Sequence, residues 1–194
     1  MDTYLVIVTV YSYFLGSIPF GFILTKIFLK QDIRETGSGN IGATNVLRTG
    51  NKFLAILTLV LDFLKGYMTI IVTLKYFNDL ILLSALICLL GHIFSIWLKF
   101  KGGKGVATYV GILFCINIYL GIGFTLVWYI VFFIFKYSSL SSLIGSLSIP
   151  VIDFFIFNNN EPFFFIIMFV LIFYTHRENI KRLLNNTESK SKIY

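Results

Sequence analysis

The sequence predicts an all-α integral membrane protein of about seven transmembrane helices, several of them short. Of the 194 residues, 57% are hydrophobic and only 13% are charged, whereas a soluble domain carries about 25% charged residues. The cations behind the formal net charge of +7 stand in short segments between apolar runs. This is the pattern of membrane topology, so the charge does not indicate nucleic-acid binding. Residues 1–194 are interpreted as one transmembrane domain with a polar tail from about residue 185.

The first apolar run, residues 4–29, is predicted to be a retained spanning helix. No cation precedes it, and it is too long to be the apolar part of a signal peptide. Pro19 is expected to kink this helix, and Ser17 and Gly21 share one face at i, i+4 spacing. These small residues predict a packing seam against a neighbouring helix.

The second run, residues 53–77, contains two charged residues, Asp62 and Lys65. They stand three apart, so they can pair on one helix face, and Thr58 and Thr69 extend the same polar stripe. A charge at the centre of a membrane costs roughly 2.5–3.5 kcal/mol on insertion scales, so the pair is expected to face the bundle interior or water. An internal ion pair that joins helices explains it as well as a functional site does.

The third run, residues 80–100, carries His92, Ser95 and Lys99 at i, i+3 and i+7. This spacing predicts a polar stripe down one helix face. His92 is expected to be either a packing residue or part of a site, and the two interpretations weigh equally.

The turn at residues 99–108 contains three glycines and three lysines between two apolar runs. Consecutive glycines let backbone amides converge on an anion. Lys101 and Lys104 add positive charge, and a helix that begins at Val106 would present its amide end to the same point. The turn therefore predicts a phosphate site. The alternative is a cationic hairpin whose lysines only follow membrane topology.

A second polar loop, residues 31–52, includes Gly37-Ser-Gly-Asn-Ile-Gly-Ala-Thr-Asn-Val-Leu-Arg48. Its glycine spacing matches the dinucleotide fingerprint, but that motif needs a preceding strand and a βαβ unit, so the match is rejected. The glycines nevertheless permit an amide nest, with Ser38 and Asn40 as donors.

A helix is expected to follow this loop, with Thr44 or Asn45 as its cap. Arg48 would then lie in the first turn, beside the positive end of the helix dipole. An arginine there is unfavourable unless an anion lies between them. The loop thus predicts a second anion site.

Residues 106–135 are predicted to form one tilted helix or two short ones, with a turn near residues 117–123. Apolar runs at 140–157 and 163–175 flank a break at 158–162. A polar helix follows at 176–184, in which His176 and Asn179 share a face and Glu178 is expected to pair with Arg182. The tail beyond Asn185, whose single acid is Glu188, is expected to fray.

Seven helices with the N-terminus outside place the cationic segments 26–52, 99–104 and the tail from His176 on the cytoplasmic side. Five spans result if residues 106–157 hold one helix instead of three. Either odd count brings the three polar motifs to one membrane face, next to apolar helices. Such a face suits a substrate with a phosphate head and a fatty tail.

Three segments, Gly37–Arg48, Gly91–Thr108 and His176–Arg182, resemble the motifs of the bacterial acyl-phosphate:glycerol-3-phosphate acyltransferases, called PlsY. They occur in the family's order, and the resemblance covers essentially the whole chain, including the element Asp62–Gly66. Two departures are Ile41, where proline is common, and Asn186, near where the family often has glycine.

The resemblance implies transfer of an acyl group from acyl phosphate to the 1-hydroxyl of sn-glycerol 3-phosphate. The products would be lysophosphatidic acid and phosphate, in the first acylation step of phospholipid synthesis. It also implies no cofactor, no acyl-CoA or acyl carrier protein as direct donor, and a cytoplasmic active site in the bacterial plasma membrane. Acyl phosphate, glycerol 3-phosphate and the lipid bilayer are thus the expected partners, whereas the oligomeric state stays open.

The resemblance also implies residue roles, in which the turn 102–105 binds glycerol 3-phosphate and Glu188 is structural. The expected catalytic residues are Ser38, Arg48, Lys104, His176 and Asn179. The expected substrate-binding residues are Gly39, Asn40, Gly42, Thr44, Asn45, His92, Ser95, Lys101, Gly102, Gly103 and Gly105. The base that takes the hydroxyl proton is His176, His92 or the leaving phosphate.

Other chemistries find little support in the sequence. Two histidines and the apolar Cys88 and Cys115 form no metal-ligand cluster, and no GxSxG elbow occurs. Neither histidine has an aspartate five residues later. The main competing class is a transporter of organic phosphates, which would place substrate groups near the bilayer midplane between repeated halves.

Overall fold

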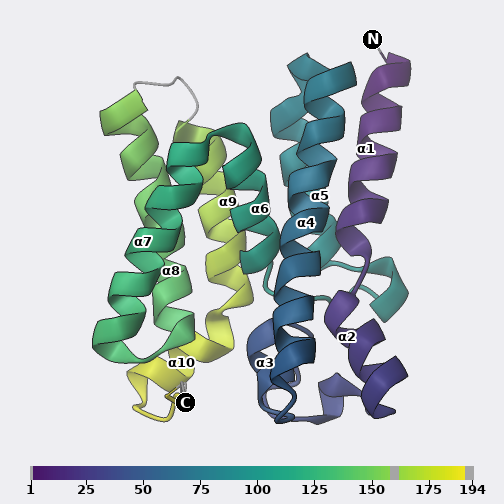
Figure 1. Cartoon of the computed structure of the whole chain (residues 1–194). Coiled ribbons are helices and arrows are strands. Elements are labelled where there is room, and N and C mark those ends of the chain that lie inside the picture. The colour runs from purple at the N-terminus through teal and green to yellow at the C-terminus, as the bar shows by residue number, and fades with distance from the viewer. Residues whose placement is uncertain (1, 158–161, 191–194) are drawn as a thin grey trace. The chain divides into compact units, whose positions relative to one another are not determined.

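The computed structural model describes residues 2–157 and 162–190, and the regular structure in these ranges is helical, without strands. This confirms the predicted all-α class. The chain divides into two compact units, residues 1–116 and 117–194. Each unit is described by itself (Figure 1).

Unit 1 begins with a broken helix. α1 (Asp2–Ser17) and α2 (Phe20–Leu24) are separated at Pro19, and a π-helical turn, Thr25–Leu29, continues α2. The two parts meet at an angle of 40°. Proline lacks the backbone N–H that would continue the helix ladder, so the predicted kink is a true break.

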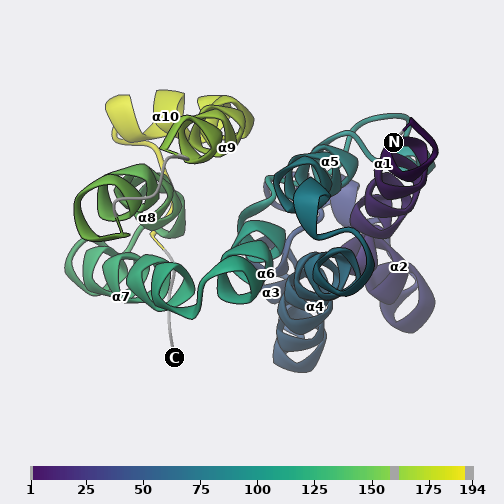
Figure 2. The ribbon, with the colours of Figure 1, turned by 90° about the horizontal axis from the view of Figure 1, so that it is seen from above.

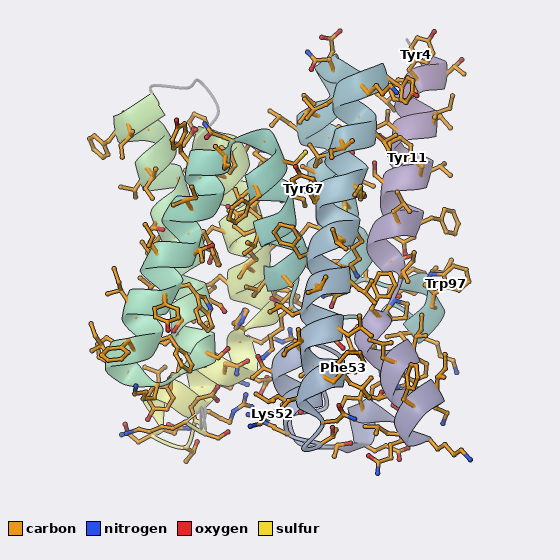
Figure 3. All side chains as sticks on the ribbon, viewed as in Figure 1. Tyr4, Tyr11, Lys52, Phe53, Tyr67 and Trp97 are labelled. Carbon is orange, nitrogen blue, oxygen red and sulfur yellow. The ribbon has the colours of Figure 1, made fainter. Side chains whose placement is uncertain are left out.

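The remaining helices of unit 1 are α3 (Ala43–Leu47), α4 (Lys52–Tyr76), α5 (Ile81–Ile93) and α6 (Val106–Ile116). Figure 3 shows Lys52 and Tyr4 at opposite ends of this unit. Side chains on the outward faces of α1 and α4, such as Tyr4 and Phe53, are large, apolar and exposed. Such faces are those of helices that contact lipid.

Two helix pairs in unit 1 approach closely through glycines (Figure 2). A Cβ on Gly16 of α1 would collide with the carbonyl of Cys88 on α5, and one on Gly66 of α4 would collide with the carbonyl of Thr108 on α6. Small residues at helix crossings are the usual means by which membrane helices bring their backbones together.

The polar stripe predicted on α4 is present and buried. Thr58, Asp62, Lys65, Thr69 and Thr73 are all at most 6% exposed. The threonine hydroxyls donate to backbone carbonyls four residues earlier in the same helix. The stripe therefore faces the interior of the unit, as the cost of lipid-exposed polar groups requires.

The stripe predicted for His92, Ser95 and Lys99 is wrong. α5 ends at Ile93, and a short 3₁₀ turn, Ile96–Leu98, follows. Ser95 Oγ donates instead to the carbonyl of Ser17 on α1, at 2.6 Å, and Lys99 takes a left-handed conformation with φ of 53°. A helical spacing has no meaning once the helix has ended.

Unit 2 contains α7 (Ile118–Phe135), α8 (Ser138–Ile152), a π-helical segment (Asp153–Phe157), α9 (Pro162–Thr175) and α10 (Arg177–Leu184). Within it α8 packs against both α7 and α9 (Figure 2). The side chain of Asn117 caps α7 by accepting the amide of Tyr119. The predicted turn near residue 117 is thus confirmed, whereas most of the predicted break, residues 158–161, lies outside the described residues.

Four helical segments of the described chain are long and apolar enough to cross a membrane, and six are if each bent pair counts as one span. The second bent pair joins α9 to α10 at 64°. α6, with 11 residues, is the additional short apolar helix. Residues 106–157 hold three separate helices, as the seven-helix prediction requires and the five-helix alternative does not.

Candidate active site

The early polar loop folds around one buried asparagine. Asn45 is 3% exposed, and its Nδ2 donates to the carbonyls of Ile33, Thr36 and Asn40 at 3.1, 3.0 and 2.8 Å. Its Oδ1 accepts the amide of Ser38 at 2.9 Å. One amide side chain therefore fixes the backbone on both sides of Ser38.

Asn45 does not cap a helix, and neither does Thr44. The N-cap of α3 is Gly42, which makes no side-chain capping bond, so Thr44 and Asn45 lie inside the helix. The Oδ1 of Asn40 accepts the amide of Gly42 at 2.9 Å. Gly39 lies in the same loop with φ of +69°, and its amide donates to the carbonyl of Thr36.

The position predicted for Arg48 is also wrong. Arg48 caps the C-terminal end of α3 and is not part of the first turn of a helix. Gly50, with φ of +87°, ends that turn, and Asn51 then caps α4 by accepting the amide of Leu54 at 3.0 Å. A cation is favourable at a helix C-terminus. The dipole argument for an anion at Arg48 therefore does not apply.

The glycine–lysine turn closes the end of α5. Gly102 and Gly103 donate their amides to the carbonyls of Ile93 and His92 at 2.9 and 3.0 Å. These carbonyls belong to the last residues of α5, where no further helical N–H is available. The predicted nest of consecutive glycine amides is thus not formed by these two residues, because their N–H groups point back at α5.

The helix predicted to begin at Val106 is confirmed as α6. Gly105 precedes it with φ of +84°, and its carbonyl accepts the amide of Tyr109. The first amides of an α-helix have no acceptor within the helix, and their end carries a partial positive charge. Lys104 stands two residues before Val106, the first residue of α6, so charge and dipole favour an anion there.

His92 lies beneath the turn and is only 4% exposed. Its Nδ1 is 3.2 Å from the hydroxyl of Thr108 in the first turns of α6 and 3.8 Å from the carboxylate of Asp62. A Cβ on Gly103 would collide with its Nε2. The imidazole is therefore enclosed by α4, α6 and the turn itself.

Asp62 and Lys65 form the predicted ion pair, with 2.8 Å between Oδ1 and Nζ, and each side chain is 3% exposed. The same Nζ donates to the carbonyl of Ile18 at 2.7 Å. Ile18 stands at the break between α1 and α2, directly before Pro19. The pair thus joins α4 to the broken helix.

An apolar core connects the early loop to the turn. Leu98, just before the turn, shares a buried cluster with Ile33, Ile41 and Val46. Ile41 is 1% exposed, and Gly21 of α2 leaves room for its carbonyl. The two motifs of unit 1 are therefore held by one core.

Trp97, labelled in Figure 3, attaches the segment before the turn to α1. Its Nε1 donates a 2.9 Å hydrogen bond to the hydroxyl of Ser17.

In unit 2, His176 stands at the start of α10 and is 2% exposed. Its Nδ1 is 2.8 Å from the carbonyl of Ile172. A carbonyl can only accept, so Nδ1 carries a hydrogen, and Nε2 is the nitrogen that accepts a proton when the imidazole is neutral. His176 therefore has the tautomer that a proton acceptor acting through Nε2 requires.

Asn179, 5% exposed, is held by the tail. Its Nδ2 donates to Glu188 at 2.7 Å, and the same carboxylate accepts from Ser139 at 2.7 Å and from Arg182 at 2.6 Å. Burial by itself would raise the pKa of Glu188. The bonds from Ser139, Asn179 and Arg182 outweigh it, so the pKa lies below its ordinary value.

Two predictions for this region are wrong. Glu178 pairs with Lys181, at 3.5 Å, and not with Arg182, which pairs with Glu188. The tail does not fray at Asn185, because the amides of residues 187 and 188 donate to the carbonyl of Arg182. Asn186 supports this return with φ of 56°, a left-handed conformation that asparagine and glycine both tolerate.

These features define a polytopic membrane protein with polar motifs, rich in amides and cations, at the ends of apolar helices. Residues 6–186 match the model of the family described as glycerol-3-phosphate acyltransferase. The chain belongs to this family.

Similar proteins agree over nearly the whole length. The glycerol-3-phosphate acyltransferase of Pelagibacter ubique is 63% identical over 188 residues, which cover 97% of this chain and 98% of that protein. The one from the Wolbachia of Brugia malayi is 47% identical and covers 98% and 99%. A crystal structure of PlsY in the glycerol 3-phosphate form is 36% identical, with a TM-score of 0.91 and coverage of 97% and 96%. The lysophosphatidic acid form gives a TM-score of 0.86.

Proposed function

We propose that the chain transfers a fatty acyl group from acyl phosphate to the 1-hydroxyl of sn-glycerol 3-phosphate. Lysophosphatidic acid and inorganic phosphate would be the products, in the first acylation of phospholipid synthesis. The observation that carries the proposal is the position of Lys104 two residues before Val106, at the amide end of α6, a combination that favours a phosphate. The PlsY structures described as glycerol 3-phosphate and lysophosphatidic acid forms support the acceptor and the product.

The chemistry asks for little covalent help from the protein. An acyl phosphate is a mixed anhydride, so the hydroxyl oxygen attacks the acyl carbon, the bond from that carbon to the phosphate oxygen breaks, and phosphate leaves. The hydroxyl proton passes to a base. The larger task is to hold two anionic substrates together, which proximity and charge neutralisation accomplish.

The following roles are proposed for the residues of unit 1. Lys104 and the first amides of α6 bind the phosphate of glycerol 3-phosphate, with Lys101 adding positive charge. Arg48 binds the phosphate of the acyl donor. The hydroxyl of Ser38 orients that donor from a loop that Asn45 holds in shape.

In unit 2, His176 is proposed as a base, acting through Nε2, with the leaving phosphate as the alternative. Its tautomer supports this role. Asn179 is proposed as a substrate contact that Glu188 orients.

The proposal includes the bacterial plasma membrane as location, with the three polar motifs at the cytoplasmic face and the N-terminus outside. It rests on the distribution of lysine and arginine between the apolar runs. Single-cysteine variants Asn51→Cys and Asp79→Cys, at the two ends of α4, test it in a chain without Cys88 and Cys115. A membrane-impermeant thiol reagent added outside intact cells should label position 79 and spare position 51; the reverse pattern contradicts the orientation.

One assay tests the reaction. Purified protein in detergent receives glycerol 3-phosphate with either acyl phosphate or acyl-CoA, and lysophosphatidic acid is measured. We expect product with acyl phosphate alone, and loss of at least a hundredfold in Arg48→Ala. Arg34→Ala is the matched control, because Arg34 is a surface residue that pairs with Asp32.

Product with acyl-CoA but not with acyl phosphate would show that the donor is wrong. Entry of labelled glycerol 3-phosphate into sealed vesicles without any acyl donor, and no product in detergent, would instead identify a transporter.

A further inference from the structure

We propose that His92 is a positioning residue that fixes the turn bearing Lys104, and that it is not the base of the reaction. The inference rests on the proposed function, in which this turn binds glycerol 3-phosphate. Its basis is that His92 contacts the chain both before and after Lys104.

The first contact lies before Lys104. The backbone carbonyl of His92 accepts the amide of Gly103 at 3.0 Å, and the imidazole lies so close to Gly103 that a Cβ there would collide with Nε2. His92 thus holds Gly103 with its backbone and with its ring.

The second contact lies after Lys104. Nδ1 of His92 is 3.2 Å from the hydroxyl of Thr108, in the first turns of α6. Thr108 is fully buried. Lys104 therefore stands between two points, Gly103 and Thr108, that the same residue holds. The distance from the end of α5 to the start of α6, and with it the path of the turn, depends on the shape of the imidazole.

The same contacts oppose a role as base. A base must come within about 3 Å of the hydroxyl whose proton it takes. Nδ1 already faces Thr108, Nε2 is covered by Gly103, and the residue is 4% exposed. The charged groups near the ring are Asp62, at 3.8 Å from Nδ1, and its partner Lys65, and both are themselves buried.

The two roles predict different kinetics. A positioning residue contributes to the binding of glycerol 3-phosphate, so its loss raises KM for this substrate and leaves kcat nearly intact. A base acts in the chemical step, so its loss lowers kcat by about 10² to 10⁴ and removes one limb of the pH profile.

The experiment uses the full-length protein with His92→Gln and Thr108→Val. Valine keeps the shape of threonine and removes the hydroxyl that faces Nδ1. We expect KM for glycerol 3-phosphate to rise roughly tenfold in both variants, with kcat within about threefold and the pH profile of kcat unchanged. KM for acyl phosphate should stay the same.

Thr58→Val is the matched control. Its hydroxyl is equally buried and bonds to the carbonyl of Leu54 in its own helix, so the KM of this variant for glycerol 3-phosphate should equal that of the parent. A fall in kcat of a hundredfold or more in His92→Gln, with a lost pH limb, overturns the inference. Unchanged KM in Thr108→Val also overturns it. If His92→Gln fails to fold, the KM of Thr108→Val for glycerol 3-phosphate decides whether the inference holds.

Thermal stabilisation by glycerol 3-phosphate separates this inference from the proposed function. If the parent protein makes no lysophosphatidic acid but is stabilised by glycerol 3-phosphate, the reaction is wrong. A weaker stabilisation in Thr108→Val, with Thr58→Val like the parent, then still supports the positioning role. Equal stabilisation of all three proteins contradicts it.

Discussion

The Nζ of Lys65 lies 2.7 Å from the carbonyl oxygen of Ile18, at the break that Pro19 makes between α1 and α2. The same ammonium lies 2.8 Å from the carboxylate of Asp62. Membrane helices tolerate a proline break where neighbouring helices bond to backbone groups beside it. In this protein a buried lysine provides one such bond, and Asp62 balances its charge.

The first prediction concerns this pair. Lys65→Met should strongly destabilise the protein, because it leaves Asp62 buried without a counter-charge and the carbonyl of Ile18 without its donor. Breaking a buried pair costs about 3–5 kcal/mol. The loss should appear as a lower Tm in detergent. Asp62→Asn combined with Lys65→Met should be less destabilised than Lys65→Met alone.

Lys75→Met is the control for this prediction. Lys75 lies in the last turn of the same helix and is exposed. The Tm of Lys75→Met should match that of the parent protein. An equal fall in Tm in Lys75→Met and Lys65→Met would show that the effect comes from methionine in α4 and not from the buried pair.

The second prediction concerns Gly102. A Cβ at this position would collide with the carbonyl oxygens of His92 and Ile93, which are backbone atoms and cannot turn aside. Gly102→Ala should therefore lower stability by about 1–3 kcal/mol and displace the turn, with loss of acyl transfer. Gly123 is a half-buried residue of α7, and the nearest atom to an added Cβ there is the flexible end of the Ile152 side chain on α8. Gly123→Ala should be neutral or slightly stabilised, because alanine is the better helix former.

The third prediction concerns Asn45. Asn45→Asp keeps the size of the side chain but removes the donor that holds three carbonyls. We expect a loss of about 1–3 kcal/mol for buried acceptors left unpaired. Activity should fall as well, because the backbone on the two sides of Ser38, at Thr36 and Asn40, loses its donor. Asn51→Asp is the matched control, since aspartate caps a helix as well as asparagine does. Similar Tm values for the two variants would contradict the role of Asn45.

The fourth prediction is a pH dependence. The pKa of Glu188 is lower in the folded protein than its ordinary value of 4.5. Its ionised form therefore stabilises the fold above pH 4.5, and this contribution is lost as the pH falls through the lowered pKa. Glu188→Gln should have a lower Tm at pH 7, and the difference from the parent should shrink on acidification below pH 4.5.

Glu178→Gln is the control for the pH series. Glu178 is 60% exposed in its pair with Lys181, and surface pairs contribute little. Its Tm should follow the parent at every pH. A Tm difference for Glu188→Gln that stays constant from pH 7 to below pH 4.5 would refute the assignment.

Much of the architecture was predictable from short stretches of sequence. The cost of exposing polar groups to lipid makes apolar runs into helices, so α4 and the division at Asn117 followed from composition and spacing. The Asp62–Lys65 pair followed from its i, i+3 spacing. The motif residues also pointed to the family, because each motif is a short continuous stretch that can be recognised in the sequence alone.

The errors share one cause, which is that they depended on contacts between distant segments. The α5 helix ends where Gly102 and Gly103 return and donate their amides to its last carbonyls. The tail is ordered by Glu188, which reaches Ser139 across 49 positions. No pattern along the chain indicates which partner a carboxylate or an amide will find.

The sequence by itself thus determined the class, the membrane helices and the residues that carry polar chemistry, since hydropathy and spacing act over a few turns of chain. Only the tertiary structure decided what those residues hold. It placed His92 under the turn that bears Lys104, and Asn45 behind Ser38. The physical reason is that a buried polar group must form a hydrogen bond, and the packing of the helices decides which partner lies within reach.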